Sequence, residues 1–407
     1  MLQLWRIAYR DLRRNKRRSI LTLIAVALGM GLLITLSGLV EGEIAGALEN
    51  SIRLQTGHLQ VREESYDEDK VSLKWEDLLA NAPGLAVQVQ ALPGVRAATP
   101  MLWASGILGM RDETVGVRVF GIDPFSEAHA PIRESLVAGQ FLSPDDRSGI
   151  LIGQQLARSL GLAEGSQISL LVNTADEQPD EAIFTIRGLY NTGVPSYDES
   201  TIFLPLAKAQ AFTRTEGRAS AILVLLHRQE DADAIAAMLR APQLEVLTWR
   251  DLNQLFLSTI EVSMSFMYLM YLIVLAIVAV VIANTLLMSV FERTREMGIL
   301  AALGMKGRQI LTMFLLEAGM LGIAGIVLGI LLGSLGVLYL ATVGLDIGVE
   351  AGVASTSFAL SSTIYARFAP SAMVGLSIAG LVITLLASLY PAWFAARMEP
   401  IDALRAL

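Results

Sequence analysis

Few side chains in this sequence have the type and spacing that catalysis or metal binding requires. His58, His129 and His227 are its only histidines; they lie far apart, and none belongs to an H-E-x-x-H pattern. Such spacing is typical of core or surface imidazoles and not of a zinc site. The five acidic residues between 63 and 69 are more typical of a solvated loop than of a catalytic pair. We therefore expect neither a metal site nor a catalytic residue in this chain.

The sequence also lacks the motifs of nucleotide-binding and hydrolytic enzymes. The sequence holds no G-x-x-x-x-G-K-[ST] loop to cradle phosphates, no G-x-S-x-G turn for a serine nucleophile, and no cysteine. Its 31 basic and 39 acidic residues give a net charge of −8, which argues against a nucleic-acid partner. The chain is thus predicted not to be an enzyme, to carry no cofactor of its own and to bind no nucleic acid.

Long apolar stretches dominate the composition. Hydrophobic residues make up 53% of the chain and charged residues only 17%, whereas a soluble domain has roughly 25% charged residues. Four long stretches lack any charged residue: 19–40, 262–291, 318–345 and 368–396. A helix needs about 20 apolar residues to cross a bilayer, and unbroken runs lack the alternation of barrel strands. We predict four transmembrane helices.

Basic residues gather at particular ends of these stretches. Seven precede the first stretch within residues 6–18, and four more lie within 293–308, between the second and third stretches. By the positive-inside rule, both termini and the loop 292–308 are cytoplasmic, and the segment 41–261 faces outward.

The N-terminal region allows alternatives. A cleaved signal peptide has an apolar core of about 7–15 residues, so the 22 residues here favour a permanent span. Four apolar residues of segment 1–18 fall on one helical face: Leu2, Trp5, Tyr9 and Leu12. With arginines over the rest of the surface, this pattern predicts an amphipathic helix in the cytoplasmic membrane interface. A disordered basic leader is the alternative.

The outward segment alternates short apolar strands with helical pieces. The predicted strands are 54–62, 114–121, 149–153, 166–172, 181–190, 201–204, 219–227 and 244–249. The predicted helices are 76–91, 154–161, 205–213 and 231–240. About 200 residues can form a core of their own. The predicted fold is therefore membrane α-helical, with four transmembrane helices plus an inserted α+β extracytoplasmic domain between the first and second spans.

Helices are expected to flank the inserted domain on both sides. Residues 41–53 continue the helical spacing of the first span, and the apolar pattern from Asp251 runs without glycine or proline into the second. A helix over 251–291 would measure about 60 Å, twice the hydrocarbon thickness. Such stalks would carry rigid-body motion, but a plain tether needs the same helices, so this geometry leaves the mechanism open.

The loop 292–308 has the most specific pattern. As a short helix it would place Met297, Leu300 and Leu303 on one side, with charged residues at its entrance, and Gly304 and Gly307 would close it. The candidate residues of this helix are Glu292, Arg293, Arg295, Glu296, Met297, Gly298, Leu300, Leu303 and Gly304. From the pattern alone, the helix is equally well an interfacial anchor or a docking surface.

Two features of the third span each allow two interpretations. Gly325, Gly329 and Gly333 form a stripe that permits close helix packing, within this chain or at a subunit interface. Glu317 is an ionisable group inside an apolar run, where burial costs roughly 2.5–3.5 kcal/mol unless the group is paired. We expect pairing with Arg293 or Arg397 more than a proton relay.

Three segments carry a resemblance to a known family. They are ERTREMGILAALGMKGRQI from Glu292, RRNKRRSILTLIAVALGMGLL at the N-terminus, and YPAWFAARMEPIDALRAL at the C-terminus. The chain resembles the FtsX-like permease family, the membrane subunits of MacB-type and lipoprotein-releasing (LolC/LolE-type) ABC transporters. The order of one span, a large external domain and three spans also agrees, so the resemblance covers the whole chain.

The resemblance implies partners and a place in the cell. It implies that residues 292–304 are a coupling helix that docks on a separate ABC ATPase subunit, present in two copies, which would bind ATP and Mg²⁺. It also implies a second permease chain, identical or related, and a multi-pass location in the bacterial cell inner membrane.

The cargo is less specific. Residues 57–61, 119–124 and 153–161 look like the lipoprotein-releasing branch, which implies lipoprotein release from the inner membrane. A MacB-like efflux of peptides or drugs and a non-transport, FtsX-type regulator of a periplasmic hydrolase remain open alternatives.

The predicted organisation follows these boundaries: interfacial helix 1–18; first span 19–40, continuing as a stalk to about 53; external domain 54–250; stalk and second span 251–291; coupling loop 292–308; third span 309–345; external loop 346–367; fourth span 368–396; cytoplasmic tail 397–407.

Overall fold

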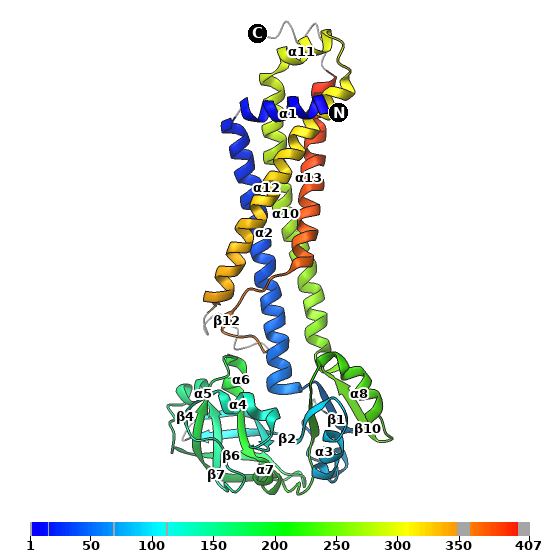
Figure 1. The fold of residues 1–407 in the computed structure, drawn as a ribbon. Coiled ribbons are helices and arrows are strands. Elements are labelled where there is room, and N and C mark those ends of the chain that lie inside the picture. Colours follow the sequence, from blue (N-terminus) through cyan, green and yellow to red (C-terminus); the bar gives the residue numbers. More distant parts are fainter. Residues whose placement is uncertain (1, 15, 68–69, 111–112, 348–358, 398–407) are drawn as a thin grey trace. The chain divides into compact units, whose positions relative to one another are not determined.

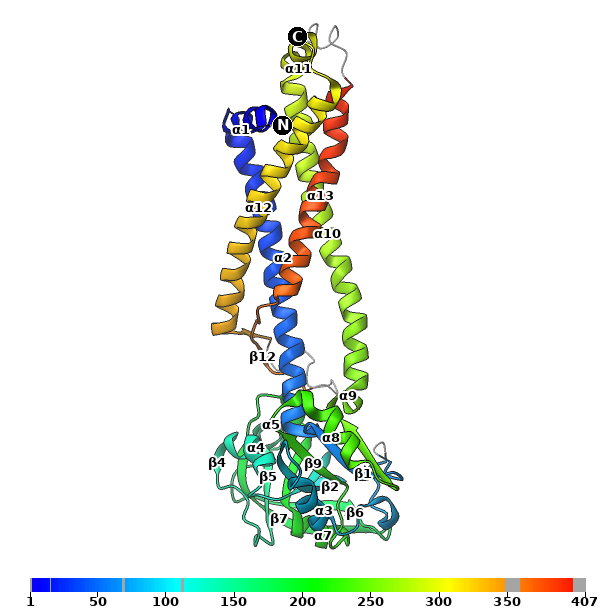
Figure 2. The same ribbon diagram turned by 45° about the vertical axis from the view of Figure 1, so that its right-hand side comes forward.

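The computed structural model describes residues 2–14, 16–67, 70–110, 113–347 and 359–397. The chain divides into two compact units, each described here by itself. We call Met1–Ile44, Ile260–Leu345 and Ile364–Leu407 the membrane unit. We call Ala45–Thr259 and Asp346–Thr363 the inserted domain. Figures 1 and 2 show their elements in two views.

The membrane unit is built from helices. They are α1 (Leu2–Arg14), α2 (Lys16–Ser51), α10 (Gln254–Glu292), α11 (Thr294–Ala302), α12 (Gly307–Val343) and α13 (Pro370–Ala396). Four of these, α2, α10, α12 and α13, are long and apolar enough to cross a membrane. The predicted fold class, four spans with an α+β domain inserted between the first and second, is confirmed.

Helix α1 lies across the direction of the long helices, and Figures 1 and 2 show it from the side and nearly end-on. Its Ala8 is fully buried in a cluster with Phe314 of α12, while Arg10 and Arg14 are exposed. The side chains of Leu2, Trp5 and Tyr9, predicted to face the membrane interface, lie outside the described residues, as do residues 398–407.

Helices α2 and α12 pack closely along the glycine stripe. A methyl group added at Gly325 would lie 2.6 Å from Val26 Cγ1, and one added at Gly333 would lie 2.7 Å from Ile34 Cβ. A methyl group at Gly329 would overlap Met30 Cβ. The glycines therefore let the backbones of α2 and α12 approach each other. Of the two interpretations of the stripe, this is packing within the chain.

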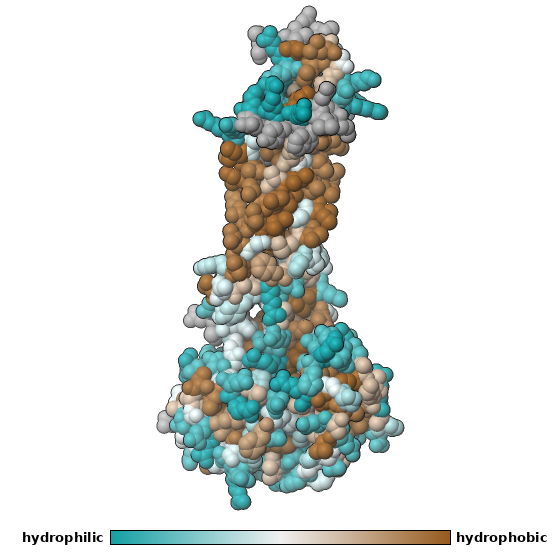
Figure 3. Space-filling view, in the orientation of Figure 1, coloured by the Kyte–Doolittle hydropathy of each residue, from teal (hydrophilic) through white to brown (hydrophobic). Residues whose placement is uncertain are grey.

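The long helices present an apolar surface between polar regions. Figure 3 shows this band of hydrophobic side chains and the hydrophilic surface beside α11. Helix α10 contributes Val262, Phe266 and Ile277, each at least 60% exposed. An exposed apolar surface of this kind would cause aggregation of a protein in water. It therefore indicates contact with lipid or with other membrane helices.

The inserted domain is built on one branched sheet. Its strands are β1 (Leu59–Glu63), β2 (Val95–Met110), β3 (Glu113–Ile122), β4 (Leu136–Gly139), β5 (Gly149–Gly153), β6 (Gln167–Asn173), β7 (Pro179–Tyr190), β8 (Thr201–Pro205), β9 (Ala221–Leu226) and β10 (Leu244–Thr248). The strand order is β10-β1-β9-β2-β3-β8-β5-β7-β4, and β6 pairs with both β2 and β7. Pairs β3–β8 and β5–β7 are parallel, and the other pairs are antiparallel.

Helices and a short strand pair complete the chain. In the inserted domain these are α3 (Ala82–Gln90), α4 (Ala130–Glu134), α5 (Gln154–Ser159), α6 (Pro195–Ser200), α7 (Leu206–Thr213), α8 (Ala232–Leu239), α9 (Trp249–Leu252), a π-helix (Ile52–Thr56), and single 3-10 turns at Trp75–Asp77, Glu127–His129 and Gln229–Asp231. Strands β11 (Leu345–Asp346) and β12 (Thr363–Ile364) pair with each other.

Two apolar cores divide the inserted domain. One includes Phe120, Phe184 and Phe203 of the central strands, and the other includes Val61 of β1 and Ile235 of α8. The long strand β2 takes part in both, because its first half pairs with β9 and its second half pairs with β6. Strand β2 thus joins the two lobes visible in Figure 1.

Three local predictions for this domain are wrong. Residues 95–110 form the longest strand, although they were not among the predicted strands. The strand expected at 54–62 begins only at Leu59, after a π-helix, because the helix from the first span continues further than expected. The helix expected at 76–91 is confined to α3, since Asn81 adopts a left-handed conformation immediately before it.

Candidate functional site

Helix α11 is a short helix between two long ones. Helix α10 ends at Glu292, α11 begins at Thr294, and Gly304 has a φ of +95° after its C-terminus. Glycine adopts this conformation without the penalty that a Cβ brings, so Gly304 permits the turn toward α12. Gly307 does not close α11 as expected; it begins α12, where an added methyl group would lie 2.7 Å from Ala396 O.

One side of α11 packs against the membrane unit. Met297 is 3% exposed, Gly298 is buried, and Leu300 packs on the same cluster as Phe314. The expectation that Leu303 shares this side is wrong, since Leu303 is 80% exposed. Leu303 follows the last helical residue, so the helical spacing that predicted its direction no longer applies.

Exposed side chains lie on α11 and on the residues that follow it up to the first turn of α12. Ile299 of α11 is 46% exposed, and Leu303, which follows the helix, is 80% exposed. Arg295, Lys306 and Arg308 are also exposed, and none has an ion pair within the part of the chain that the structure describes. We call these five residues the α11 surface. Exposed apolar and cationic side chains of this kind occur together at protein interfaces.

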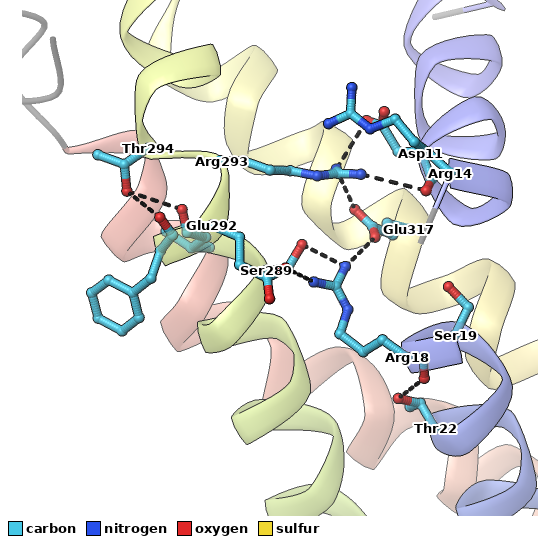
Figure 4. A network of polar contacts seen from close by, with 12 residues as sticks. Asp11, Arg14, Arg18, Ser19, Thr22, Ser289, Glu292, Arg293, Thr294 and Glu317 are labelled. Carbon is cyan, nitrogen blue, oxygen red and sulfur yellow. Dashed lines mark hydrogen bonds and ion pairs between the residues drawn. The ribbon is translucent and has the colours of Figure 1, made fainter. Parts of the chain in front are cut away.

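A network of charged side chains links the helices near α11, and Figure 4 labels its members other than Glu296. We call it the ion cluster; it consists of Asp11, Arg14, Arg18, Glu292, Arg293, Glu296 and Glu317. These residues come from α1, α2, α10, α11 and α12 and from the residue between α10 and α11. The ion cluster therefore joins every helix at this end except α13.

Glu317 and Arg293 are the most deeply buried members of the ion cluster. Their exposed fractions are 1% and 2%, and Arg293 Nη1 lies 3.7 Å from Glu317 Oε2. The expected pairing of these two residues is confirmed. The other expected partner, Arg397, instead stacks over the ring of Trp393 at 4.5 Å.

Arg18 and Asp11 complete the buried part, and sequence reasoning missed both. Arg18 Nη2 lies 3.7 Å from Glu317 Oε1, and Arg293 Nη1 lies 3.1 Å from Asp11 Oδ2. The Glu317 carboxylate thus lies between two guanidiniums. Asp11 and Arg18 lie hundreds of residues from Glu317 in the sequence, so no spacing rule could connect them.

The outer part of the ion cluster holds two predicted coupling residues. Glu292 pairs with Arg18 at 2.9 Å, and Glu296 pairs with Arg14 at 2.5 Å. Their carboxylates are thus engaged within the chain, which makes them poorer candidates for direct partner contacts than the α11 surface.

The histidines do not form a site. The amide of Leu226 donates to His58 Nδ1 at 2.8 Å, and His129 Nδ1 lies 3.1 Å from Asp123 O. His227 is exposed. Among the described residues, no group of three or more histidine, cysteine, aspartate or glutamate side chains is arranged to hold a metal ion.

A groove of about 530 Å³ lies elsewhere in the membrane unit, between α2, α10 and α13. Its walls are mainly apolar, with Val40, Leu272 and Leu376 among the lining residues. Gly375 also lines it, and a methyl group added there would meet no atom within 4 Å. The groove is therefore open at Gly375.

Four apolar spans, with an α+β domain inserted after the first and a short helix between the second and third, define a class of membrane permease subunits. Residues 19–241 match the MacB-like periplasmic core domain, and residues 268–400 match the FtsX-like permease C-terminal domain. The chain belongs to the FtsX-like permease family, with a MacB-like periplasmic core as its inserted domain. The resemblance inferred from the sequence is confirmed.

Curated relatives align over nearly the whole chain. The lipoprotein-releasing system transmembrane protein LolC of Neisseria meningitidis is 24% identical and covers 99% of both chains. The macrolide export ATP-binding/permease protein MacB of Nitrobacter winogradskyi is 24% identical over 98% of this chain and 59% of its own length. An uncharacterised ABC transporter permease of Methanocaldococcus jannaschii is 22% identical over 98% of this chain and 96% of its own length. The chain is thus an ABC transporter permease of the LolC and MacB type.

Proposed function

We propose that this permease couples ATP hydrolysis by a separate ATPase subunit to motion of its inserted domain, and that it releases lipoproteins from the inner membrane. The observation that carries the coupling role is the α11 surface. MacB-like efflux of peptides or drugs and FtsX-type regulation of a periplasmic hydrolase are the alternatives.

The α11 surface has the chemistry of a docking site. Leu303 and Ile299 would fill an apolar pocket on the ATPase, because a few well-packed side chains near the centre of a contact contribute most of its binding energy. Arg295, Lys306 and Arg308 would meet acidic residues at the rim of that pocket. Burial of Met297 fixes the helix that presents them.

The placement in the membrane rests on charge. The basic residues before the first span and around α11 favour a cytoplasmic location for both termini and for α11. The inserted domain is then periplasmic, and ATP and Mg²⁺ are bound by the ATPase, since this sequence has no phosphate-binding loop. In this proposal the chain itself is not catalytic.

The assembly is proposed to contain two permease chains and two ATPase subunits. Each chain offers one α11 surface, and the exposed apolar side chains of α10, such as Phe266, are available to a second permease chain, identical or related. Closure of the ATPase pair would draw the two α11 helices together.

Motion would reach the inserted domain through α2 and α10. Helix α2 runs without interruption from Lys16 to Ser51, and α10 begins at Gln254. Within the inserted domain, Ser51 donates a hydrogen bond to Asn253 Oδ1 at 2.6 Å, and both side chains are buried. This hydrogen bond links the end of α2 to the residue that precedes α10. A shift of either helix would therefore displace the part of the inserted domain that contains Ser51 and Asn253.

The groove between α2, α10 and α13 supports a lipid-linked cargo. A mainly apolar groove among membrane helices fits an acyl chain better than a polar peptide or an ion. Relatives named as lipoprotein-releasing proteins align over their full length, and this also favours lipoprotein over drug.

A single substitution tests the docking role. Leu303→Glu should abolish copurification of the ATPase with the tagged permease, since a charge would enter the apolar centre of the contact. Ile183→Glu, which changes an exposed apolar residue of the inserted domain, is the matched control. Full ATPase recovery with Leu303→Glu would count against docking at α11.

A second substitution tests the cargo. Gly375→Phe places a ring at the groove, where an added Cβ meets no atom within 4 Å, and should abolish ATP-dependent release of a triacylated lipoprotein from proteoliposomes, with ATPase binding unchanged. Val382→Phe, on the exposed side of the same helix, should release lipoprotein normally. Release of a macrolide or peptide in place of lipoprotein would favour efflux, and capture of a periplasmic hydrolase without any cargo would favour the regulator.

A further inference from the structure

The chain's connectivity creates a mechanical problem that the ion cluster solves. Helix α11 is covalently continuous with α10 and α12, because only a few residues separate them. Helix α2 has no such connection to α11, since about 240 residues separate them in the chain. Any displacement of α11 must reach α2 through noncovalent contacts.

Arg18 supplies polar contacts from α2 at that end. Arg18 of α2 reaches Glu292 Oε2 at 2.9 Å, Ser289 Oγ at 2.8 Å and Glu317 Oε1 at 3.7 Å. One side chain of α2 therefore contacts both helices that flank α11.

Arg293 makes the matching set of contacts from the other direction. It precedes α11, and it reaches α1 through Asp11 Oδ2 at 3.1 Å and α12 through Glu317 Oε2 at 3.7 Å. Arg14 of α1 adds a contact to Glu296 of α11 at 2.5 Å. Figure 4 shows Glu317 at the meeting point of the two arginines.

Burial gives these contacts their stiffness. The cluster contains three guanidiniums and four carboxylates, and its central pair, Arg293 and Glu317, is almost completely removed from solvent, whereas the outer Arg14–Glu296 pair is 53% and 46% exposed. Coulomb attraction is strong where water does not screen it. A buried ion that is separated from its partner has no water or other charge to stabilise it, so the separation costs free energy. Relative motion of α2 and α11 would require such a separation.

We propose that the ion cluster, with Glu317 as its central residue, holds α1, α2 and α11 together so that displacement of α11 moves α2 with it. This inference rests on the proposed function, because it assigns the route by which ATPase closure reaches the first span. The glycine stripe of α12 then keeps α2 in register along the rest of its membrane-spanning length.

The absence of cysteine makes a direct test simple. Spin labels at Ile20→Cys on α2 and Ala302→Cys on α11 occupy exposed positions and report the distance between the two helices within one chain. The measurement is made on the permease alone and on the ATPase complex, without nucleotide and with ATP trapped. A rigid connection predicts the same narrow distance distribution in all these states.

Glu317→Gln should break the connection while keeping the shape of the side chain. We expect its distance distribution to broaden in the permease alone and to become nucleotide-dependent in the complex. Lipoprotein release per ATP should fall on the order of tenfold while the ATPase still copurifies. Thr384→Val, which alters a buried polar residue of α13 outside the cluster, should behave like the unsubstituted protein.

Defined outcomes overturn the inference. It fails if the distance in the unsubstituted permease changes with nucleotide, or if Glu317→Gln keeps the narrow distribution in every state. Should Glu317→Gln not accumulate, the double variant Glu317→Gln/Arg293→Gln removes one charge of each sign and must show the same broadening. Failure of the proposed function is distinguishable, because it would appear as an ATPase that does not copurify with the unsubstituted permease.

Discussion

A buried polar site of the membrane unit and one of the inserted domain differ in charge. In the membrane unit, Arg293 and Glu317 are almost fully buried and oppose each other as full charges. In the inserted domain, the buried hydroxyl of Tyr190 donates to the carbonyl oxygen of Thr201 at 2.7 Å, and this contact involves no charge.

The difference teaches where charge has a role beyond folding. Neutral hydrogen bonds are enough to fix the core around Tyr190. A buried ion pair is weak support for stability, because apolar residues of similar volume often replace it without loss. The ion cluster therefore points to positioning of the helices it joins, and three sets of substitutions test this comparison.

The largest effect is expected at the centre of the ion cluster. Glu317→Leu removes the carboxylate between Arg18 and Arg293, and the free energy of unfolding should fall by about 3–5 kcal/mol. The double variant Glu317→Leu/Arg293→Met should lose less than the sum of the single variants, since no guanidinium of Arg293 is then left buried. Thermal unfolding of the purified permease measures both, and strict additivity would contradict a shared network.

An intermediate effect is expected from two buried titratable groups of the inserted domain. Burial lowers the pKa of His129 to about 4, and burial raises the pKa of Asp198 to about 6. As pH falls from about 6.5 to 4, the unfolded state takes up a proton at His129 that the folded state resists, so stability is lost. Over nearly the same range the folded state takes up a proton at Asp198 before the unfolded state does, so stability is gained.

These opposite slopes predict that substitutions at the two residues change the pH dependence of stability in opposite directions. His129→Gln should make the domain more stable on acidification relative to the unsubstituted protein, and Asp198→Asn should make it less stable, each by roughly 1–3 kcal/mol across the window. Unfolding midpoints at a series of pH values measure the slopes. Identical pH profiles for both variants would show that neither group titrates differently on folding.

The smallest effect is expected at an exposed ion pair of the inserted domain. Arg250 and Asp233 lie 2.7 Å apart, but their side chains are 55% and 64% exposed. Asp233→Asn should change the free energy of unfolding by about 0–1 kcal/mol, because solvent and salt screen the pair. A cost as large as that of Glu317→Leu would remove the distinction between the two regions.

The sequence by itself determined the parts that depend on local composition. Four charge-free stretches predicted four spans, because a bilayer accepts only long apolar helices or closed barrels. The position of α11 followed from the polar loop 292–308, and the buried partner Arg293 followed from the cost of leaving Glu317 unpaired.

Only the tertiary structure decided what depends on residues distant in the chain. Arg18 and Asp11 became partners of the Arg293–Glu317 pair through the packing of α1 and α2, which no periodicity encodes. Strand β2 is stabilised by β3, β6 and β9, although its own sequence gave no strand signal, because strand propensity depends strongly on neighbours. Leu303 is exposed since α11 ends one residue earlier, and helical spacing holds only while the helix continues.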